Sequence, residues 1–164
     1  LTPLSASDRN KRSSAGGKLA EEAFLHKLSE VPGNAHCADC CSASRVTWAS
    51  VTFGVVLCAE CVGGHRSLGT HISEPLSLRM DSWTDDMRDH MMARGNDAAN
   101  REYEALASHR DYKPKADDCV DQKHAYIRAK YVDRCFSKGG SGTLQLPATR
   151  VGGAGRTAPQ QINA

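Results

Sequence analysis

Two Cys-x-x-Cys pairs, Cys37/Cys40 and Cys58/Cys61, constrain more than any other feature what this chain can fold into. A Cys-x-x-Cys turn directs two thiolates at one point, and two such turns supply a tetrahedral ligand set for Zn²⁺. Four thiolates leave the metal no open position, so one structural zinc ion is expected as the cofactor. The alternative, four buried thiols that pair by chance, is disfavoured by the regular spacing.

Three further cysteines and three histidines compete for the metal. Cys41 follows Cys40 directly, but its use would stretch the first turn to Cys-x-x-x-Cys, so Cys40 is preferred. Cys119 and Cys135 have no partner at ligand spacing and are expected to be ordinary thiols. Because the thiolate set is already complete, supporting or packing roles are expected for the histidines His36, His65 and His71.

Length and cysteine use indicate a single zinc-stabilised domain in a reducing compartment. At 164 residues the chain is long enough for one core, and aromatic residues at 5% predict a modest, aliphatic one. Zinc binding would then supply much of the stability. Seven cysteines without a secretory signal indicate metal binding and not a disulfide framework, which favours the cytoplasm.

The charges are unevenly distributed along the chain. Residues 1–18 and 137–164 each carry a net +3, which leaves −4 for residues 19–136. An acidic body with weakly basic ends is a poor match for a nucleic-acid backbone, so no nucleic-acid partner is expected.

The hydrophobic periodicity and the positions of turn residues predict an α+β fold, with about three strands in one sheet and about five surrounding helices. The first helix, 18–30, has an apolar stripe of Leu19, Ala23, Leu25 and Leu28. A short helix start is expected in GGHRSLG, after the last cysteine pair. The remaining expectations are a disordered tail 1–17, strands 46–52, 55–57 and 76–80, helices from Ser82 or Thr84 to about 93, 97–106 and 121–135, and a flexible tail 137–164. The zinc domain would therefore span residues 18–136.

A series of short motifs links these elements to a known family. CADC, TWAS, GVVLCAEC, GGHRSLGTHIS, SLRMDSW and GN follow one another between Cys37 and Asn96, and weaker matches continue to about Phe136. This series resembles the GTPase-activating domain of Arf regulators, the ArfGAP domain. The resemblance implies a zinc-bearing domain that binds a GTP-loaded Arf-family GTPase, accelerates GTP hydrolysis and regulates vesicle traffic. It also places the family's arginine finger at Arg66.

Physical chemistry supports that assignment for Arg66. An arginine from a partner can neutralise charge on the transferred phosphoryl group and accelerate hydrolysis by about 10³–10⁵. Such a group must be held rigidly, and Arg66 lies five residues after the zinc ligand Cys61. The alternative is a structural ion pair of Arg66 with an acid, for which the candidates are Asp39, Glu60 and Asp81. The resemblance favours the finger.

The resemblance also suggests residues that support the finger or face the GTPase. Trp48 is expected to pack close to Arg66, and Asp81 to orient Arg66 or a neighbouring backbone amide. Leu68, His71 and Ile72 could form the GTPase-facing surface or pack beneath it, and His65 could support it.

Two departures from the family pattern affect the loop before Trp48. The family usually places 16 residues between the cysteine pairs, whereas 17 residues run from Cys41 to Leu57. Cys41 also stands where the family commonly has a small residue, often glycine. Both changes concern loop geometry and leave the zinc ligands intact.

Two other functions are compatible with part of the sequence. The 17-residue spacing is shared by GATA-type nucleic-acid-binding zinc fingers, but only Arg66 is basic between Cys61 and Arg79. The second is a zinc module that binds proteins without activating a GTPase, against which only the presence of Arg66 argues. The protein is expected to be a monomer that is not an enzyme by itself. It should be cytoplasmic and peripheral at Golgi or endosomal membranes.

Overall fold

The computed structural model describes the backbone of residues 6–140 and 142, and side chains from residue 17 onward except residue 109. It confirms an α+β fold with one three-stranded sheet and five helices among these residues. None of the described helices combines the length and apolar composition needed to cross a bilayer. The elements in chain order are α1 (Ala6–Glu30), β1 (Val46–Ser50), β2 (Val55–Cys58), α2 (Cys61–Leu68), β3 (Pro75–Ser77), α3 (Asp85–Tyr103), α4 (His109–Tyr112) and α5 (Val120–Tyr131).

The sheet is antiparallel, with strand order β2-β1-β3. Trp48 on the central strand is opposite Leu57 on one side and Ser77 on the other. The register shifts between Val46 and Trp48, which makes a bulge just before the tryptophan. An additional residue in this part of the chain can be absorbed by such a bulge. Gly54 turns the chain from β1 into β2 with a φ of 67°, as its place between the two predicted strands indicated.

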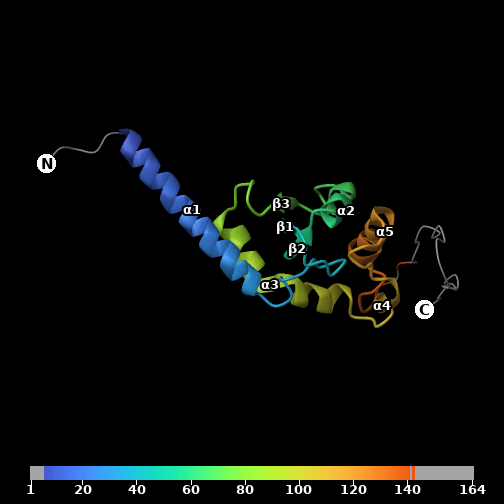
Figure 1. The fold of residues 1–164 in the computed structure, drawn as a ribbon. Coiled ribbons are helices and arrows are strands. Elements are labelled where there is room, and N and C mark those ends of the chain that lie inside the picture. Colours follow the sequence, from blue (N-terminus) through green and yellow to red (C-terminus); the bar gives the residue numbers. More distant parts are fainter. Residues whose placement is uncertain (1–5, 141, 143–164) are drawn as a thin grey trace.

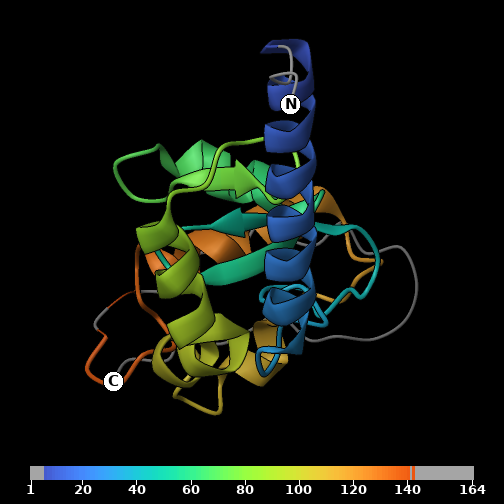
Figure 2. The ribbon, with the colours of Figure 1, turned by 90° about the vertical axis from the view of Figure 1, so that its left-hand side faces the viewer.

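Helices cover both faces of the sheet (Figures 1 and 2). α1 and α3 lie against one face, and α2 and α5 lie against the other. Alternation along β2 distributes its side chains between these layers, because successive residues of a strand point to opposite faces. Val56 packs toward α1 and α3, whereas Val55 and Leu57 pack toward α2 and α5.

The core contains more aromatic side chains than the composition predicted. Aliphatic side chains form most of the buried hydrophobic set, as expected, but six of the nine aromatic residues are buried as well: Phe24, Phe53, Tyr103, Tyr126, Tyr131 and Phe136. Phe53 stacks on Tyr131, with ring centroids 4.3 Å apart, and meets Tyr103 edge-on at 5.5 Å. The low overall content of aromatic residues therefore conceals a local cluster of aromatic side chains beside α2 and α5.

The first helix differs from its prediction in length and in its buried face. α1 begins at Ala6, so residues 6–17 are helical where we predicted disorder, and it extends beyond the body of the domain (Figure 1). Helix propagation from a packed C-terminal part stabilises such an extension despite a polar composition. Phe24 and Leu28 are buried, whereas Leu19 is 74% exposed. Ala23 is also exposed, whereas Leu25 packs against the same cluster as Leu28, so the predicted stripe is confirmed at Leu25 and Leu28 and wrong at Leu19 and Ala23.

The other boundaries differ by a few residues. The predicted break between the helix that ends near residue 93 and the helix that starts at residue 97 is confirmed: Gly95 has a φ of 71° and divides α3 into two segments. Thr84 caps the first segment, since its hydroxyl accepts a hydrogen bond from the amide of Met87. β3 ends at Ser77, and α5 ends at Tyr131 before its predicted limit of 135. Most of the predicted tail 137–164, namely residue 141 and residues 143–164, lies outside the described residues.

Candidate functional site

The four paired cysteines meet in one buried cluster. Their Sγ atoms all lie within 4.8 Å of one another, and those of Cys40 and Cys58 are 3.7 Å apart. A Zn–S distance of about 2.3 Å in a tetrahedron corresponds to sulfur separations of about 3.8 Å. Cys37, Cys40, Cys58 and Cys61 therefore form a structural zinc site, as the sequence predicted. The set is complete with four thiolates and offers no position for catalysis by the metal.

Each cysteine pair is built into the secondary structure. The amide of Cys41 donates to the carbonyl oxygen of Cys37 at 3.1 Å and closes the first turn, while the amide of Ala38 bonds to Val56 of β2. The second pair joins the end of β2, at Cys58, to the start of α2, at Cys61. Zinc binding consequently ties the first loop to both a strand and the helix that carries Arg66.

The competing metal ligands lie elsewhere. Cys41 and Cys119 are exposed, and neither they nor Cys135 belong to a metal-sized cluster among the described residues. His36 and His71 are also exposed. His65 is fully buried, but its ring nitrogens bond to other side chains and not to the cysteine cluster.

A buried hydrogen-bonded chain starts at Asp39, between the first two cysteines. Its Oδ2 lies 3.0 Å from Nε2 of His65, whose Nδ1 lies 2.9 Å from the hydroxyl of Ser73. Ser73 in turn bonds to Ser50 of β1 at 2.8 Å. With Nε2–H donating to the carboxylate, Nδ1 accepts from Ser73, so every polar atom of the imidazole has a partner. This chain fixes α2 against the zinc loop and the sheet.

Lys130 of α5 extends the network on the other side of Asp39. Its ammonium group lies 2.9 Å from Asp39 Oδ1 and 2.7 Å from Glu104 Oε1, and all three side chains are buried. The hydroxyls of Tyr131 and Tyr126 donate to Asp39 and Glu104 respectively, each at 2.9 Å. Removing one member of such a buried ion pair strongly destabilises the fold, because the other member then remains buried without a partner for its charge.

These contacts shift the pKa values of both acids downward. Burial alone would raise the pKa of Asp39, but attraction to Lys130 and hydrogen bonding from His65 outweigh it and hold the pKa well below its usual value. For Glu104, burial likewise raises the pKa, whereas Lys130 and Lys113 lower it to a greater extent. The pKa of Lys130 is raised, because the two carboxylates outweigh the effect of burial. All three groups are therefore charged near neutral pH.

Arg66 lies on the exposed side of α2. Its guanidinium carbon is 4.4 Å from the centre of the Trp48 ring, and Trp48 itself is half-buried on the central strand. The three acids considered as structural partners are engaged by other groups. Asp39 binds His65 and Lys130, Glu60 pairs with Lys123, and Asp81 accepts a hydrogen bond from the amide of Ser77 at 2.6 Å.

The remaining predicted site residues divide by exposure. Leu68 is buried, and Ile72 is half-buried against the same cluster, so both pack beneath the surface around α2. His71 is exposed and lies against Gly69, where an added Cβ would come within 2.7 Å of its ring. Asp81 is exposed, and its contact with the amide of Ser77 stabilises the turn after β3.

The comparisons with known proteins agree with this architecture. The profile of the ArfGap family, described as "Putative GTPase activating protein for Arf", matches residues 22–140, which is more than half of the chain. The chain belongs to the ArfGap family.

Relatives and a solved structure place the ArfGap domain in context. The human protein "Arf-GAP with coiled-coil, ANK repeat and PH domain-containing protein 2" is 44% identical over 118 residues, 72% of this chain but 15% of its own length. The Arabidopsis thaliana protein "Probable ADP-ribosylation factor GTPase-activating protein AGD13" is 46% identical over 115 residues, 70% of this chain and 34% of its own. The solution structure of the ArfGap domain of human RIP matches with a TM-score of 0.60 at 21% identity, over 70% of this chain and 84% of that one. The last match supports the fold alone.

Glycines in α2 allow α5 of the ArfGap domain to approach closely. An added Cβ at Gly64 would lie 2.6 Å from Cδ1 of Ile127, and one at Gly63 would lie 3.2 Å from Nε2 of His124. The Gly-Gly pair in a helical segment is the sequence signal for this contact, although sequence reasoning used it only to mark a short helix.

Sequence reasoning also missed the residues that connect distant segments. The side chain of Asn96 accepts from the amide of Val56 at 2.8 Å and donates to the carbonyl of His36 at 2.7 Å, so it joins α3 to β2 and the zinc loop. Lys130 was predicted only as part of the helix 121–135. α5 also contains Lys123 and Arg128, so charge alone did not single it out, and its partners Asp39, 91 residues away, and Glu104, just after α3, lie on other elements.

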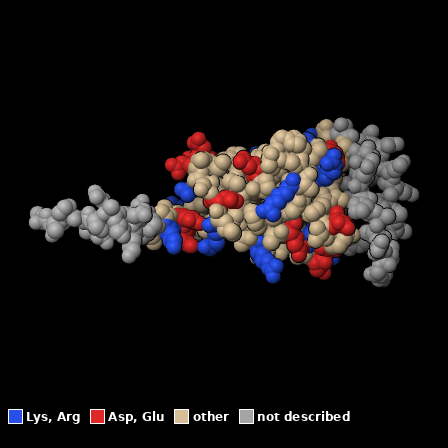
Figure 3. Space-filling model, turned by 90° about the horizontal axis from the view of Figure 1, so that it is seen from above, with Lys and Arg blue, Asp and Glu red and all other residues tan. Residues whose placement is uncertain are grey.

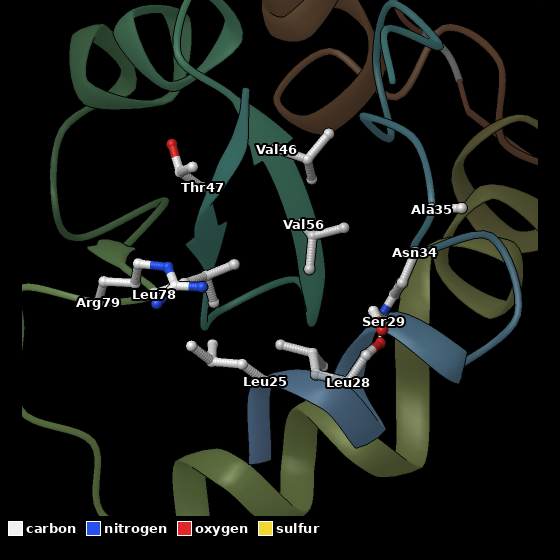
Figure 4. A pocket seen from close by; sticks show the side chains of 10 residues that line it. All are labelled: Leu25, Leu28, Ser29, Asn34, Ala35, Val46, Thr47, Val56, Leu78 and Arg79. Carbon is white, nitrogen blue, oxygen red and sulfur yellow. The ribbon is translucent and has the colours of Figure 1, made fainter. Parts of the chain in front are cut away.

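A hollow on the opposite face of the sheet has no part in this site. It has a volume of about 270 Å³ between α1 and the sheet, and its floor is apolar (Figure 4). Leu25 and Leu28 of α1 point toward Val56 and Leu78, with Arg79 at the rim.

On the face of the ArfGap domain seen from above, basic and acidic side chains are interspersed (Figure 3).

Proposed function

We propose that this ArfGap domain is a GTPase-activating module for an Arf-family small GTPase and that Arg66 is its arginine finger. The observation that carries the proposal is the way in which the surrounding structure holds Arg66. It is exposed on a short helix that starts at a zinc ligand and is fixed on its buried side by His65. The named activities of the relatives support the same function, although the human relative is far longer than the matched region.

The chemistry requires a positive group that arrives with the partner. Charge on the transferred phosphoryl group is spread over several oxygens, which the planar guanidinium can engage with two parallel hydrogen bonds. An arginine finger is worth about 10³–10⁵ in rate. The zinc site would supply no chemistry of its own and would hold α2 in place.

The ring of Trp48 offers Arg66 a resting position. A cation–π contact at an exposed site is worth only about 0.5–1 kcal/mol, so the guanidinium can leave it when a stronger acceptor is presented. Phosphoryl oxygens are such an acceptor. In this mechanism Trp48 limits the freedom of Arg66 in the free protein, and the docked GTPase replaces the ring as its partner.

The proposal extends to the wider role of the domain. The domain completes the active site of a partner GTPase and has no catalytic cycle of its own. We propose that it acts as a monomer in the cytoplasm, peripherally at Golgi or endosomal membranes, and that it regulates vesicle traffic.

Single-turnover GTP hydrolysis by a panel of GTP-loaded Arf proteins tests the proposal. Wild type should accelerate hydrolysis by at least one panel member, and Arg66→Lys should lose about 10³-fold or more of that effect. Arg101→Lys, on the exposed surface of α3, is the matched control and should retain wild-type stimulation. Both variants should keep the zinc content and thermal unfolding of wild type.

Two results would contradict the proposal in different ways. Stimulation by Arg66→Lys equal to that of wild type would remove the finger assignment. Absence of stimulation by the folded, zinc-loaded wild type across the panel would leave a zinc module that only binds proteins.

A further inference from the structure

A second hollow, of about 400 Å³, opens beside the first cysteine turn. Its walls come from this turn, from α4 and from the segment that follows α4, and they include Cys40, Cys41, Arg110, Lys113, Pro114 and Lys115. Among the described residues, its lining includes none from α2 or from β1. It is therefore separate from the surface that presents Arg66.

The charged side chains that line this hollow are all positive. Arg110, Lys113 and Lys115 contribute to its wall, whereas no acidic residue does so among the described residues. Lys113 is fixed, since its ammonium group binds both carboxylate oxygens of Glu104, at 2.9 and 2.8 Å. Arg110 and Lys115 are exposed, and neither forms a side-chain ion pair within the described part of the chain.

The backbone around Lys115 is also ordered. Its amide donates to Oδ2 of Asp118 at 2.7 Å, and Ala116 accepts a hydrogen bond from the buried ammonium group of Lys123 at 2.7 Å. Pro114 is buried. Two exposed cationic side chains, one on α4 and one on this turn, thus lie next to a third that is already anchored.

We propose that this hollow binds a compact polyphosphate anion, the chemistry shared by soluble inositol polyphosphates and phosphoinositide headgroups. The guanidinium of Arg110 can engage two phosphate oxygens at once, and the ammonium group of Lys115 can bind a second phosphate as a point charge. The net negative charge of the described body does not prevent this, because a hollow lined by one sign of charge concentrates its own field. This site is independent of GTPase activation.

A simpler role for the three cations is compensation of the zinc centre. One zinc ion with four thiolates carries a net negative charge, and Cys40 belongs to both the centre and the hollow. In that case the exposed Arg110 and Lys115 would affect zinc retention and would bind no ligand. Affinity for an anion and affinity for zinc therefore distinguish the two roles.

Calorimetry with inositol hexakisphosphate tests the site on the zinc-loaded full chain. Arg110→Glu and Lys115→Glu should each weaken binding about tenfold or more, the loss expected for one charge-assisted hydrogen bond. The matched control Arg128→Glu changes an exposed arginine of α5 and should bind like wild type. No binding by wild type, equal loss in the control, or lower zinc content in the two variants would overturn the proposal.

Vesicle sedimentation distinguishes the sources of the anion. Phosphatidylcholine vesicles with and without phosphatidylinositol bisphosphate are the probes. Sedimentation only with the phosphoinositide, reduced in Arg110→Glu, would support a lipid headgroup. Binding of the soluble anion without sedimentation would support a free polyphosphate.

Cys41 provides a readout of position, because its exposed thiol lines the hollow. Saturating inositol hexakisphosphate should slow its alkylation by iodoacetamide at least severalfold, as measured by mass spectrometry. Cys119, an exposed thiol outside the lining, is the internal control and should react at an unchanged rate. Equal effects on both thiols, or none on Cys41, would show that the anion does not bind here.

Discussion

The two faces of the sheet are covered by helices but held by different forces. On the α1 and α3 face, six buried apolar residues pack without a charged network and border an open hollow. On the α2 and α5 face, the core contains four cysteines, an aromatic cluster and a chain of buried acids and bases. Apolar packing is non-directional, whereas metal bonds and hydrogen bonds specify angles as well as distances.

This difference indicates what each face does. A finger arginine must be positioned within a fraction of an ångström, and the directional bonds lie on the face that carries Arg66. The α1 face contributes burial, and small errors in its packing should cost stability without displacing α2. Substitutions on each face test that division.

Removal of zinc should unfold the domain. Structural zinc binding is worth about 10–16 kcal/mol in small zinc modules, which equals or exceeds the stability of an ordinary domain. Chelation, or Cys58→Ala, should therefore abolish the cooperative thermal transition and GTPase stimulation together. Circular dichroism with a zinc assay measures this loss. A cooperative transition that persists after complete zinc removal would show that the cysteines are not the main support.

Glu104→Gln should produce a large loss of stability without touching the metal site. It removes a carboxylate from Lys130 and Lys113, and breaking a buried pair costs about 3–5 kcal/mol. The pKa of Glu104 is lowered by folding, so its contribution is complete above the unfolded value, about 4.3, and is lost as the pH falls through the lower folded value.

Denaturant unfolding at several pH values measures this contribution. The difference between wild type and Glu104→Gln should be constant near neutral pH and should shrink as the pH falls below about 4. A difference that stays constant into that range would show that the charge of Glu104 is not what stabilises the network.

Leu28→Ala tests the opposite face. Leu28 is only 2% exposed, and truncation of a buried leucine costs about 2–5 kcal/mol. Below the unfolding temperature, the variant should nevertheless stimulate GTP hydrolysis within about twofold of wild type, because its contacts do not reach α2. Loss of stimulation in the folded variant would break the comparison between the faces.

Cys41→Gly should produce the smallest effect, and a favourable one. Cys41 has a φ of 56°, a left-handed conformation that costs a residue with a Cβ about 1–2 kcal/mol. Glycine removes that strain but loses more entropy on folding, so a net gain of about 0.5–1 kcal/mol is expected. Thermal unfolding measures the gain, with Cys41→Ser as a control that keeps the strain. Equal stability of the two variants would contradict the explanation.

Local signals were sufficient for the zinc ligands and for most of the fold. Cysteine spacing identified Cys37, Cys40, Cys58 and Cys61, because a metal knuckle is defined by residues that are close in the chain. Gly54 and Gly95 were placed correctly for the same reason: a turn with positive φ is a local event. The unexpected helix at residues 6–17 shows the limit of composition, since cooperativity along a helix can override polar sequence.

The sequence by itself determined the metal site, the order of the elements and the family, and it placed an arginine five residues after a ligand. Only the tertiary structure decided what surrounds that arginine. Asp39 and Lys130 lie 91 residues apart and meet at 2.9 Å, and Trp48 reaches Arg66 from another element. Such contacts depend on how helices and strands pack in three dimensions, and periodicity within one element carries no information about them.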